Sequence, residues 1–445
     1  MLAAALLTLA AAPSFVGDWY GAVHISLESQ IPIVLHIGDV STLDSPAQNV
    51  TGMPISVTRN GDTLRVVLDG AGAEFDGRLS PDGNALEGPF TQNGAVMDAK
   101  FVRRDGAHAQ TKRPQDPSAP YPYATREVHF PSARATLAGT LTFPSCATKC
   151  PAAVLIAGSG RQDRDETVAG HRPFLIIADR LTRAGFAVLR YDKRGVGQSE
   201  GRFDDITHDI LVADARAAIA FLKHVPGVDA ERIGLVGHSE GADIAVSAAS
   251  LDDGIAFVAL MSAAGESGYE TVLAQQHAVQ ITSGVSADGI KHSQQLERSL
   301  LDIARSATDI SQARRSIESR LHDEGLNDVD ATKQAEAITS RWYIDFLNRD
   351  PAPTYKKLHV PVLILAGSKD LQVLPDRNLP KLRAELAGNP QTTIIELPGL
   401  NHLLQPANLG SPSEYGAIDV TIDPKALDIL SDWMTDVAKR NVKPR

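Results

Sequence analysis

The strongest chemical signal is the pentapeptide Gly237-His238-Ser239-Glu240-Gly241, which directly follows the apolar run 233–236. A strand that ends in a glycine-flanked turn and continues as a helix lifts the serine hydroxyl out of the backbone, where a base can reach it. The small, alanine-rich run 242–249 behind the serine is typical of such a helix. The pattern therefore predicts that Ser239 is a nucleophile.

Two later segments supply the groups that a nucleophilic serine needs. The run 360–367 reads as a buried parallel strand and is followed by Asp370, and the run 392–397 leads into a loop with His402. Because catalytic groups in open α/β sheets gather at the carboxyl ends of the strands, we expect both side chains at one edge. The chain order Ser239, Asp370, His402 is the order of an α/β-hydrolase triad.

Each predicted role follows from the chemistry of the group. A serine hydroxyl is a weak nucleophile until an imidazole removes its proton, and a carboxylate must hold that imidazole in one tautomer. His402 is the predicted base and Asp370 the carboxylate that orients it. The alternatives are that His402 is a loop histidine without a task and that Asp370 caps the next helix. Glu266, after the apolar run 256–260, is the rival acid.

An oxyanion hole is expected where the apolar run 151–157 ends in Gly158-Ser159-Gly160. Two backbone N–H groups aimed at the developing negative oxygen supply much of the electrostatic stabilisation in acyl transfer, and glycines let the backbone come close. We assign these N–H groups to Ser159 and Glu240. The alternative is a phosphate-binding loop, but the lysine of that motif does not follow.

Five motifs follow one another in the second part of the chain: Gly158-Ser159-Gly160 with Gln162-Asp163-Arg164-Asp165, the segment 191–199, the elbow, and the segments of Asp370 and His402. With these motifs, residues from about 125 to 440 resemble the α/β-hydrolase superfamily, and within it the bacterial secreted esterase and serine-aminopeptidase-like branch. The resemblance implies a mostly parallel sheet with a helical cap, and a serine hydrolase that needs no cofactor and no metal. Many relatives carry histidine before the oxyanion glycine, where this chain has Ala157.

The first part of the chain has a different pattern, with strand-length apolar or alternating runs separated by turn signals, and we expect an all-β antiparallel domain over 15–105. Asn-Gly and Asp-Gly pairs at 60–61, 82–83 and 93–94 are hairpin signals. His24 and His36 sit on strand patterns and are interpreted as structural. The strand-length runs are 19–26, 31–40, 55–59 and 63–68.

Two further segments complete the predicted organisation. The stretch 106–124 contains Pro114, Pro117, Pro120 and Pro122 and is interpreted as a stiff linker. A helical pattern over about 265–354 interrupts the strand–helix alternation of the hydrolase domain, 125–440. An insertion there would form a cap over Ser239 and shape the acyl pocket, although plain extra helical packing is the alternative.

Charge and composition limit the classes of partner that the protein is expected to bind. The net charge is −11 and no basic cluster is long enough to follow a phosphate backbone, so the sequence argues against nucleic-acid binding. There is no run of 18 apolar residues that would span a bilayer. Residues 1–12 resemble a signal remnant without its basic start, and we expect a secreted or periplasmic protein. Cys146 and Cys150 could form a small disulfide, and a zinc site is not expected.

The sequence predicts a serine hydrolase, a carboxylesterase acting on small or medium acyl esters through an acyl-enzyme. A peptidase, an aminopeptidase or an acyl thioesterase would use the same three residues, and the sequence does not choose among their leaving groups. A binding protein on a hydrolase scaffold with an idle triad is the alternative from another class.

Overall fold

The computed structural model describes residues 15–24, 30–38, 40–45, 50–68, 72–92, 95–104 and 113–440. The chain forms two compact units, 1–110 and 111–445. The predicted signal remnant, 1–12, lies outside the described residues, as does the hairpin signal at 93–94. Among the described residues, no helix is long and apolar enough to cross a membrane.

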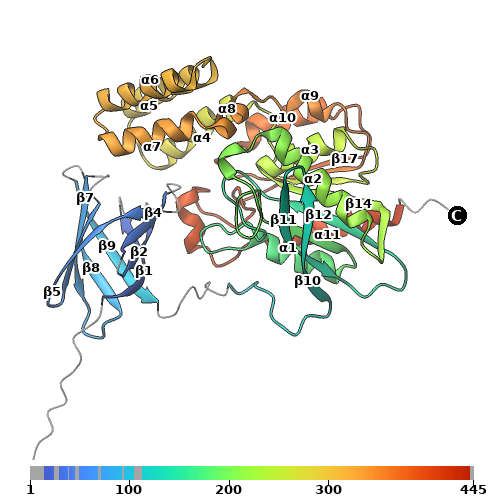
Figure 1. The fold of residues 1–445 in the computed structure, drawn as a ribbon, viewed down its shortest axis with the longest axis horizontal. Helices are drawn as coiled ribbons and strands as arrows, with labels where there is room; N and C mark the ends of the chain where they lie inside the picture. The colour runs from blue at the N-terminus through green and yellow to red at the C-terminus, as the bar shows by residue number, and fades with distance from the viewer. Residues whose placement is uncertain are drawn as a thin grey trace, which may run out of the picture. The chain divides into compact units, whose positions relative to one another are not determined.

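The N-terminal unit is one antiparallel sheet of nine strands, in the order β4-β3-β2-β1-β9-β8-β7-β6-β5. Successive strands pair with one another except β4 and β5, which lie at the two ends of the sheet, and β1 also pairs with β9. Figure 1 shows that this sheet is curved. Trp19, Phe75 and Phe101 are fully buried in its apolar core. The strands are β1 (Gly17–His24), β2 (Gln30–Ile37), β3 (Thr42–Ser45), β4 (Val50–Pro54), β5 (Ser56–Asn60), β6 (Thr63–Leu68), β7 (Ala73–Leu79), β8 (Ala85–Gln92) and β9 (Ala95–Arg104).

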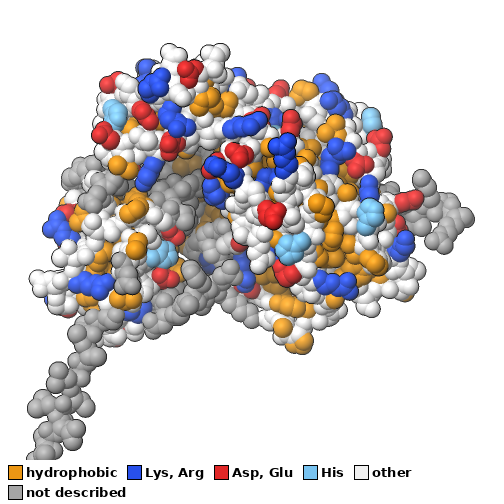
Figure 2. Space-filling view, viewed as in Figure 1, with side chains coloured by type: hydrophobic (Ala, Val, Ile, Leu, Met, Phe, Trp, Pro, Cys, Tyr) orange, Lys and Arg blue, Asp and Glu red, His pale blue; other side chains and the backbone are white. Residues whose placement is uncertain are grey.

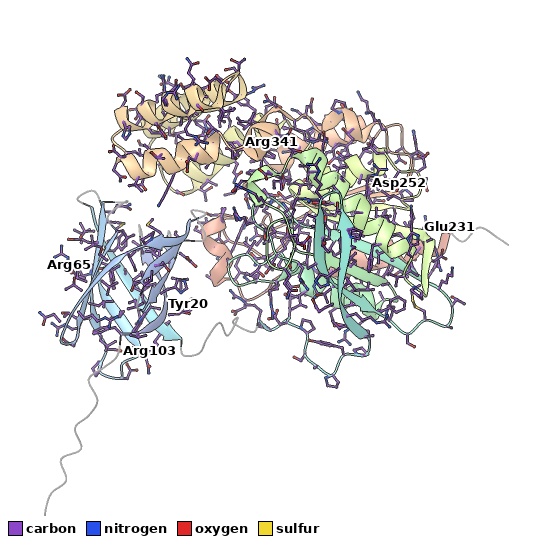
Figure 3. All side chains as sticks on the ribbon, in the orientation of Figure 1. Tyr20, Arg65, Arg103, Glu231, Asp252 and Arg341 are labelled. Carbon is purple, nitrogen blue, oxygen red and sulfur yellow. A yellow bond between two sulfur atoms is a disulfide. The ribbon has the colours of Figure 1, made fainter. Side chains whose placement is uncertain are left out.

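The polar side chains of this unit pair near its surface. The guanidinium of Arg103, labelled in Figure 3, lies 4.4 Å from the centre of the Trp19 ring. His36 lies between two carboxylates, 2.8 Å from Asp18 and 3.1 Å from Asp44. These contacts give His36 a structural role in joining three neighbouring strands. The side chain of His24 lies outside the described part of the unit.

The second unit is built on an eight-stranded sheet in the order β10-β11-β13-β12-β14-β15-β16-β17. The pairings β10–β11 and β11–β13 are antiparallel and the rest are parallel. The predicted fold class is therefore confirmed. The strands are β10 (Ala124–Ser132), β11 (Ala135–Phe143), β12 (Cys150–Ile156), β13 (Ala187–Tyr191), β14 (Val228–His238), β15 (Val258–Met261), β16 (Val362–Gly367) and β17 (Thr392–Leu397).

Helices cover both faces of this sheet, which explains why its central strands are apolar throughout. The helices α2 (His208–Lys223), α3 (Glu240–Ser250) and α10 (Pro375–Glu385) share one apolar core with the sheet. The helices α1 (Pro173–Arg183) and α11 (Pro424–Arg440) share the other core, on the opposite face. Because strands β12 to β17 run parallel to one another, their carboxyl ends lie at one edge of the sheet.

Six helices lie between β15 and β16, in the segment that the sequence predicts as an insertion. They have an apolar core of their own around Leu301, Ile317 and Leu347. Figure 2 shows side chains of both charges mixed over the visible face of these helices. The helices are α4 (Gly268–Thr282), α5 (Ala287–Arg305), α6 (Ile310–Asp323), α7 (Asp328–Ile338), α8 (Arg341–Asn348) and α9 (Ala352–Tyr355).

The described end of the proline-rich segment is bonded to the hydrolase unit. The Arg113 guanidinium donates to the carbonyls of Gly416 (2.9 Å) and Ile418 (3.0 Å). Gln115 donates to the Ile422 carbonyl at 2.7 Å and accepts the Thr421 N–H at 2.6 Å. From residue 113 onward this segment is therefore a fixed strap and not a free tether.

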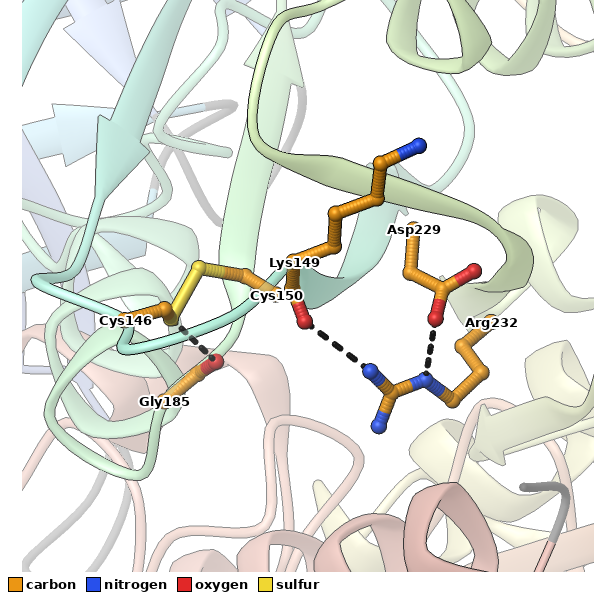
Figure 4. The surroundings of a disulfide bond; sticks show 6 residues. All are labelled: Cys146, Lys149, Cys150, Gly185, Asp229 and Arg232. Carbon is orange, nitrogen blue, oxygen red and sulfur yellow. Dashed lines mark hydrogen bonds and ion pairs between the residues drawn. A yellow bond between two sulfur atoms is a disulfide. The ribbon is translucent and has the colours of Figure 1, made fainter. Parts of the chain in front are cut away.

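Cys146 and Cys150 form a disulfide at the entry to β12 (Figure 4). Beside it, Arg232 donates to the Lys149 carbonyl at 2.9 Å and to the Asp229 carboxylate at 2.8 Å. The disulfide closes the loop before the first parallel strand on itself, and the Arg232 hydrogen bond holds this loop to the start of β14.

Candidate active site

The serine at 239 sits on a strained turn between β14 and α3. Its backbone has φ 54° and ψ −121°, a region that non-glycine residues rarely adopt and that costs roughly 1–3 kcal/mol. A Cβ at Gly237 would lie 2.2 Å from the Gly241 carbonyl oxygen, and a Cβ at Gly241 would lie 2.0 Å from that of Ile156. Both glycines are therefore sterically required, as the sequence pattern indicates.

The structure brings Asp370 and His402 together. His402 Nδ1 lies 2.8 Å from Asp370 Oδ2, and the side chains are 5% and 0% exposed. Asp370 Oδ1 accepts the N–H groups of Gln372 and Val373, both at 2.8 Å. Because this carboxylate only accepts, Nδ1 carries the hydrogen that His402 donates, and Nε2 keeps the free lone pair that a base needs.

The His402 loop is hydrogen-bonded to the end of β14, which leads into Ser239, and to the residue after β15. The His402 carbonyl accepts from Ser262 Oγ at 2.7 Å and from His238 Nε2 at 3.1 Å. The rings of His238 and His402 are 4.9 Å apart between centroids. Since Ser239 directly follows His238, these contacts hold His402 at the elbow.

Glu266, the rival acid, is occupied elsewhere. Arg377 donates to both of its carboxylate oxygens, at 2.7 and 2.8 Å, and Lys381 lies 3.2 Å away. Of the two candidate carboxylates, the one on the His402 imidazole is Asp370.

The two residues assigned to the oxyanion hole line one cavity with Ser239. Glu240 is the first residue of α3, so its N–H has no partner within the helix. Ser159 follows Gly158 in the loop after β12. Among the hydrogen bonds of the described residues, neither N–H donates to a protein acceptor. Both are free to donate to a substrate oxygen.

The cavity has a volume of about 80 Å³, and three parts of the unit line it. The elbow contributes Ser239, the helical insertion contributes Phe346 and Arg349, and the loop after Asp370 contributes Val373. The insertion therefore contributes to the wall of the cavity that Ser239 also lines.

A buried carboxylate that the sequence analysis missed connects two of these loops. Glu166 accepts the Gly158 N–H at 2.5 Å and lies 2.9 Å from His238 Nδ1. Burial lowers the pKa of His238, but the Glu166 carboxylate outweighs burial and the net direction is upward. Only the position of Glu166 just after the motif 162–165 hinted at this role.

Two further residues escaped the sequence analysis. Asn401 is fully buried and accepts the N–H groups of Leu403 (3.0 Å) and Gln405 (2.9 Å), which shapes the His402 loop. Lys193 is 4% exposed and donates to Glu240 Oε2 at 2.9 Å. Lys193 lies within the motif 191–199, but its partners are distant in sequence. Among the described residues, no group of three or more potential ligands could hold a metal ion.

The mixed sheet, the strained turn at Ser239 and the hydrogen-bonded Asp370–His402 pair are features of an α/β hydrolase. The chain belongs to the family described as "Serine aminopeptidase, S33", which matches residues 172–405, a range that contains Ser239, Asp370 and His402.

Individual relatives differ in how much of the chain they resemble. Esterase EstD of Thermotoga maritima is 26% identical over 309 residues, which are 67% of this chain and 65% of EstD. Thiohydrolase aneE of Aspergillus aculeatus is 36% identical over 76 residues, which are 17% of this chain and 24% of that protein. The chain thus spans less than two thirds of either relative. The crystal structure of the α/β hydrolase GrgF from Penicillium sp. sh18 is 18% identical, with a TM-score of 0.45, covering 72% of this chain and 99% of that one.

Proposed function

We propose that this protein is a serine hydrolase that cleaves carboxylic esters of small or medium, uncharged acyl groups. The observation that carries the proposal is the buried Asp370–His402 pair held at the elbow of Ser239. The name of the relative EstD, an esterase, supports the same reaction class.

In the proposed reaction, Ser239 Oγ attacks the acyl carbon while His402 Nε2 takes its proton. The carbonyl oxygen becomes an oxyanion that accepts from the N–H groups of Ser159 and Glu240. Collapse breaks the ester bond, and His402 gives the proton to the leaving alcohol. Water, activated by His402, then releases the acid from the acyl-enzyme. Asp370 holds the imidazole in its tautomer throughout.

The charges around the cavity favour an ester over an aminopeptidase substrate. An aminopeptidase must accept the ammonium group of its substrate, which calls for an unpaired carboxylate near the nucleophile. In the described structure, each carboxylate on the cavity wall already has a cation: Lys193 on Glu240, Arg349 on Asp243 and Arg377 on Glu266. An uncharged acyl group fits this wall better.

A thioesterase is the second candidate, because the matched thiohydrolase shares 36% identity with a short part of the chain. Thioesters and oxygen esters pass through the same tetrahedral intermediate, so the three residues serve both. The helical insertion is proposed as the cap that sets acyl size, since Phe346 and Arg349 line the cavity beside Ser239.

The test is a substrate panel on purified protein: p-nitrophenyl esters from acetate to decanoate, a matching thioester and an aminoacyl p-nitroanilide. We expect the short esters to be the best substrates and Ser239→Ala to lower their kcat/KM by about 10⁴-fold or more. Fluorophosphonate should label the wild type and not Ser239→Ala. Ser250→Ala, at the far end of α3, is the matched control and should keep the wild-type rate. Wild-type hydrolysis by Ser239→Ala would contradict the proposal, and a preference for the anilide would replace the esterase by an aminopeptidase.

We also propose that the protein works in an oxidising compartment outside the cytoplasm. The Cys146–Cys150 disulfide supports this, because such bonds persist where thiols are not kept reduced. Thiol labelling of the protein from its native host should find both cysteines oxidised, in the periplasmic or secreted fraction; reduced cysteines in a cytoplasmic fraction would refute it.

A further inference from the structure

Of the four polar backbone atoms of Gly158 and Ser159, all but the Ser159 N–H, the proposed oxyanion donor, are held by side-chain contacts. The Gly158 N–H donates to Glu166 at 2.5 Å, and the Ser159 carbonyl accepts from Gln162 Nε2 at 3.0 Å. The Gly158 carbonyl accepts from the ammonium group of Lys193. The Ser159 N–H is the fourth of these atoms, and among the hydrogen bonds of the described residues it donates to no protein acceptor.

The contact at the Gly158 carbonyl fixes the direction of the Ser159 N–H. Both belong to the same peptide unit, and in a trans peptide the C=O and N–H bonds point in opposite directions. An ammonium group that anchors the carbonyl on one side therefore turns the N–H to the other side. Gly158 lacks a Cβ, so little steric resistance would otherwise oppose rotation of this peptide.

The same ammonium group also reaches the second oxyanion residue. Lys193 Nζ donates to Glu240 Oε2 at 2.9 Å, and the other carboxylate oxygen of Glu240 accepts from Trp342 Nε1 at 2.6 Å. Glu240 is thus held between the loop after β13 and helix α8 of the insertion. Its own N–H is the second oxyanion donor.

We propose that Lys193 is a positioning residue for the oxyanion hole, because its buried ammonium group anchors the Gly158–Ser159 peptide and the Glu240 side chain at once. This inference rests on the proposed function and assigns a role to a residue that does not touch the substrate. It explains the burial of a lysine that is 4% exposed, since a lone buried charge would be costly and this one has a carboxylate and a carbonyl as partners.

The decisive variant is Lys193→Met, which keeps the length of the side chain and removes the donor. We expect kcat per active site for p-nitrophenyl butyrate to fall about 10- to 100-fold, less than the loss of a whole oxyanion donor, while KM changes less than about 3-fold. A trifluoromethyl ketone inhibitor, whose adduct with Ser239 carries an oxyanion, should lose affinity by a similar factor. Fluorophosphonate titration counts the folded active sites, so misfolding does not enter the comparison.

Arg194→Met is the matched control. Arg194 is the next residue in the same loop, is also buried, and likewise donates to a carboxylate, Asp214, and to a carbonyl, that of Ser132. It does not touch the oxyanion loop. Its loss should lower stability and leave kcat per active site and inhibitor affinity unchanged.

In Lys193→Met the buried Glu240 carboxylate has no cation, and the protein could fail to fold for that reason alone. The double variant Lys193→Met/Glu240→Gln removes this charge and so tests the role of Lys193 in a folded protein. It should regain stability and keep the low kcat. If Ser239→Ala is inactive while the lysine variants keep wild-type kcat and inhibitor affinity, the role of Lys193 is overturned and the proposed function stands. If Ser239→Ala keeps its rate, the proposed function fails and the role of Lys193 fails with it.

Discussion

Ion pairs of the N-terminal unit and ion pairs at the carboxyl edge of the hydrolase sheet differ in their exposure to water. In the N-terminal unit, the Arg78–Asp62 side chains are 70% and 54% exposed, and those of Lys100 and Glu87 are 60% and 58% exposed. Pairs of this kind contribute about 0–1 kcal/mol each, because water and salt screen them. The unit is held by its apolar core instead.

At the carboxyl edge of the hydrolase sheet the pairs are buried. Lys193 and Glu240 are 4% and 5% exposed, and His238 and Glu166 are 7% and 2% exposed. Removing charges from water costs several kcal/mol per ion, so a buried pair adds little net stability. The comparison teaches that buried pairs mark where this molecule needs fixed geometry, and that exposed pairs carry no such information.

The largest expected effect comes from breaking the buried pair on the imidazole. Asp370→Asn should lower kcat by about 10³- to 10⁴-fold, because the amide no longer selects the tautomer with a free Nε2. Glu266→Gln should change kcat less than about 10-fold. Steady-state kinetics with fluorophosphonate titration measure both. The reverse ranking would mean that Glu266 is the acid.

A second effect of intermediate size concerns the His238–Glu166 pair. Its loss in Glu166→Gln should cost about 3 kcal/mol of unfolding free energy at pH 6. Because Glu166 holds the pKa of His238 above its usual value, this stabilisation is fully present below about pH 6.5 and is lost as pH rises through the raised pKa. Urea unfolding of both proteins from pH 5.5 to 9 should show the difference shrinking with pH. A constant difference would exclude a charged pair.

The smallest expected effect concerns His36 in the N-terminal unit, where the ionic contacts are more exposed than at the carboxyl edge of the hydrolase sheet. Burial lowers the pKa of His36, but Asp18 and Asp44 outweigh it and the net direction is upward. His36→Gln should therefore weaken β1 and β2 by no more than about 1 kcal/mol below pH 6.5, and less at higher pH. Hydrogen exchange of peptides from these strands in the full chain measures it. A loss of several kcal/mol would show that this partly exposed cluster behaves like the buried pairs.

Local patterns were enough to predict much of the hydrolase unit. The elbow follows from two glycines that must lie close to backbone oxygens, and the run 392–397 coincides with strand β17. The pairing of Asp370 with His402 could be anticipated from strand order alone, because parallel strands end at one edge.

The contacts that hold the site could not be predicted in this way. Glu166 meets His238 across 72 residues, Lys193 meets Glu240 across 47, and Trp342 reaches Glu240 across 102. Each depends on how loops from different strands pack, which local propensity and periodicity do not encode. For the same reason, the sequence motifs predicted the chemically active groups but not the residues, such as Glu166 and Lys193, that hold the surrounding loops in position.

The strap at residues 113–116 has a practical consequence for separating the two units. Arg113 and Gln115 saturate carbonyls and amides of the turn at 416–422, which follows His402 in the chain. If a protease cut the chain just after Gln115, the Arg113 and Gln115 side chains would leave with the N-terminal fragment, and the turn would lose these hydrogen bonds. Cleavage before Arg113 would leave both side chains bonded to the turn. The position of the cut therefore decides whether the separated hydrolase unit keeps the conformation of this turn.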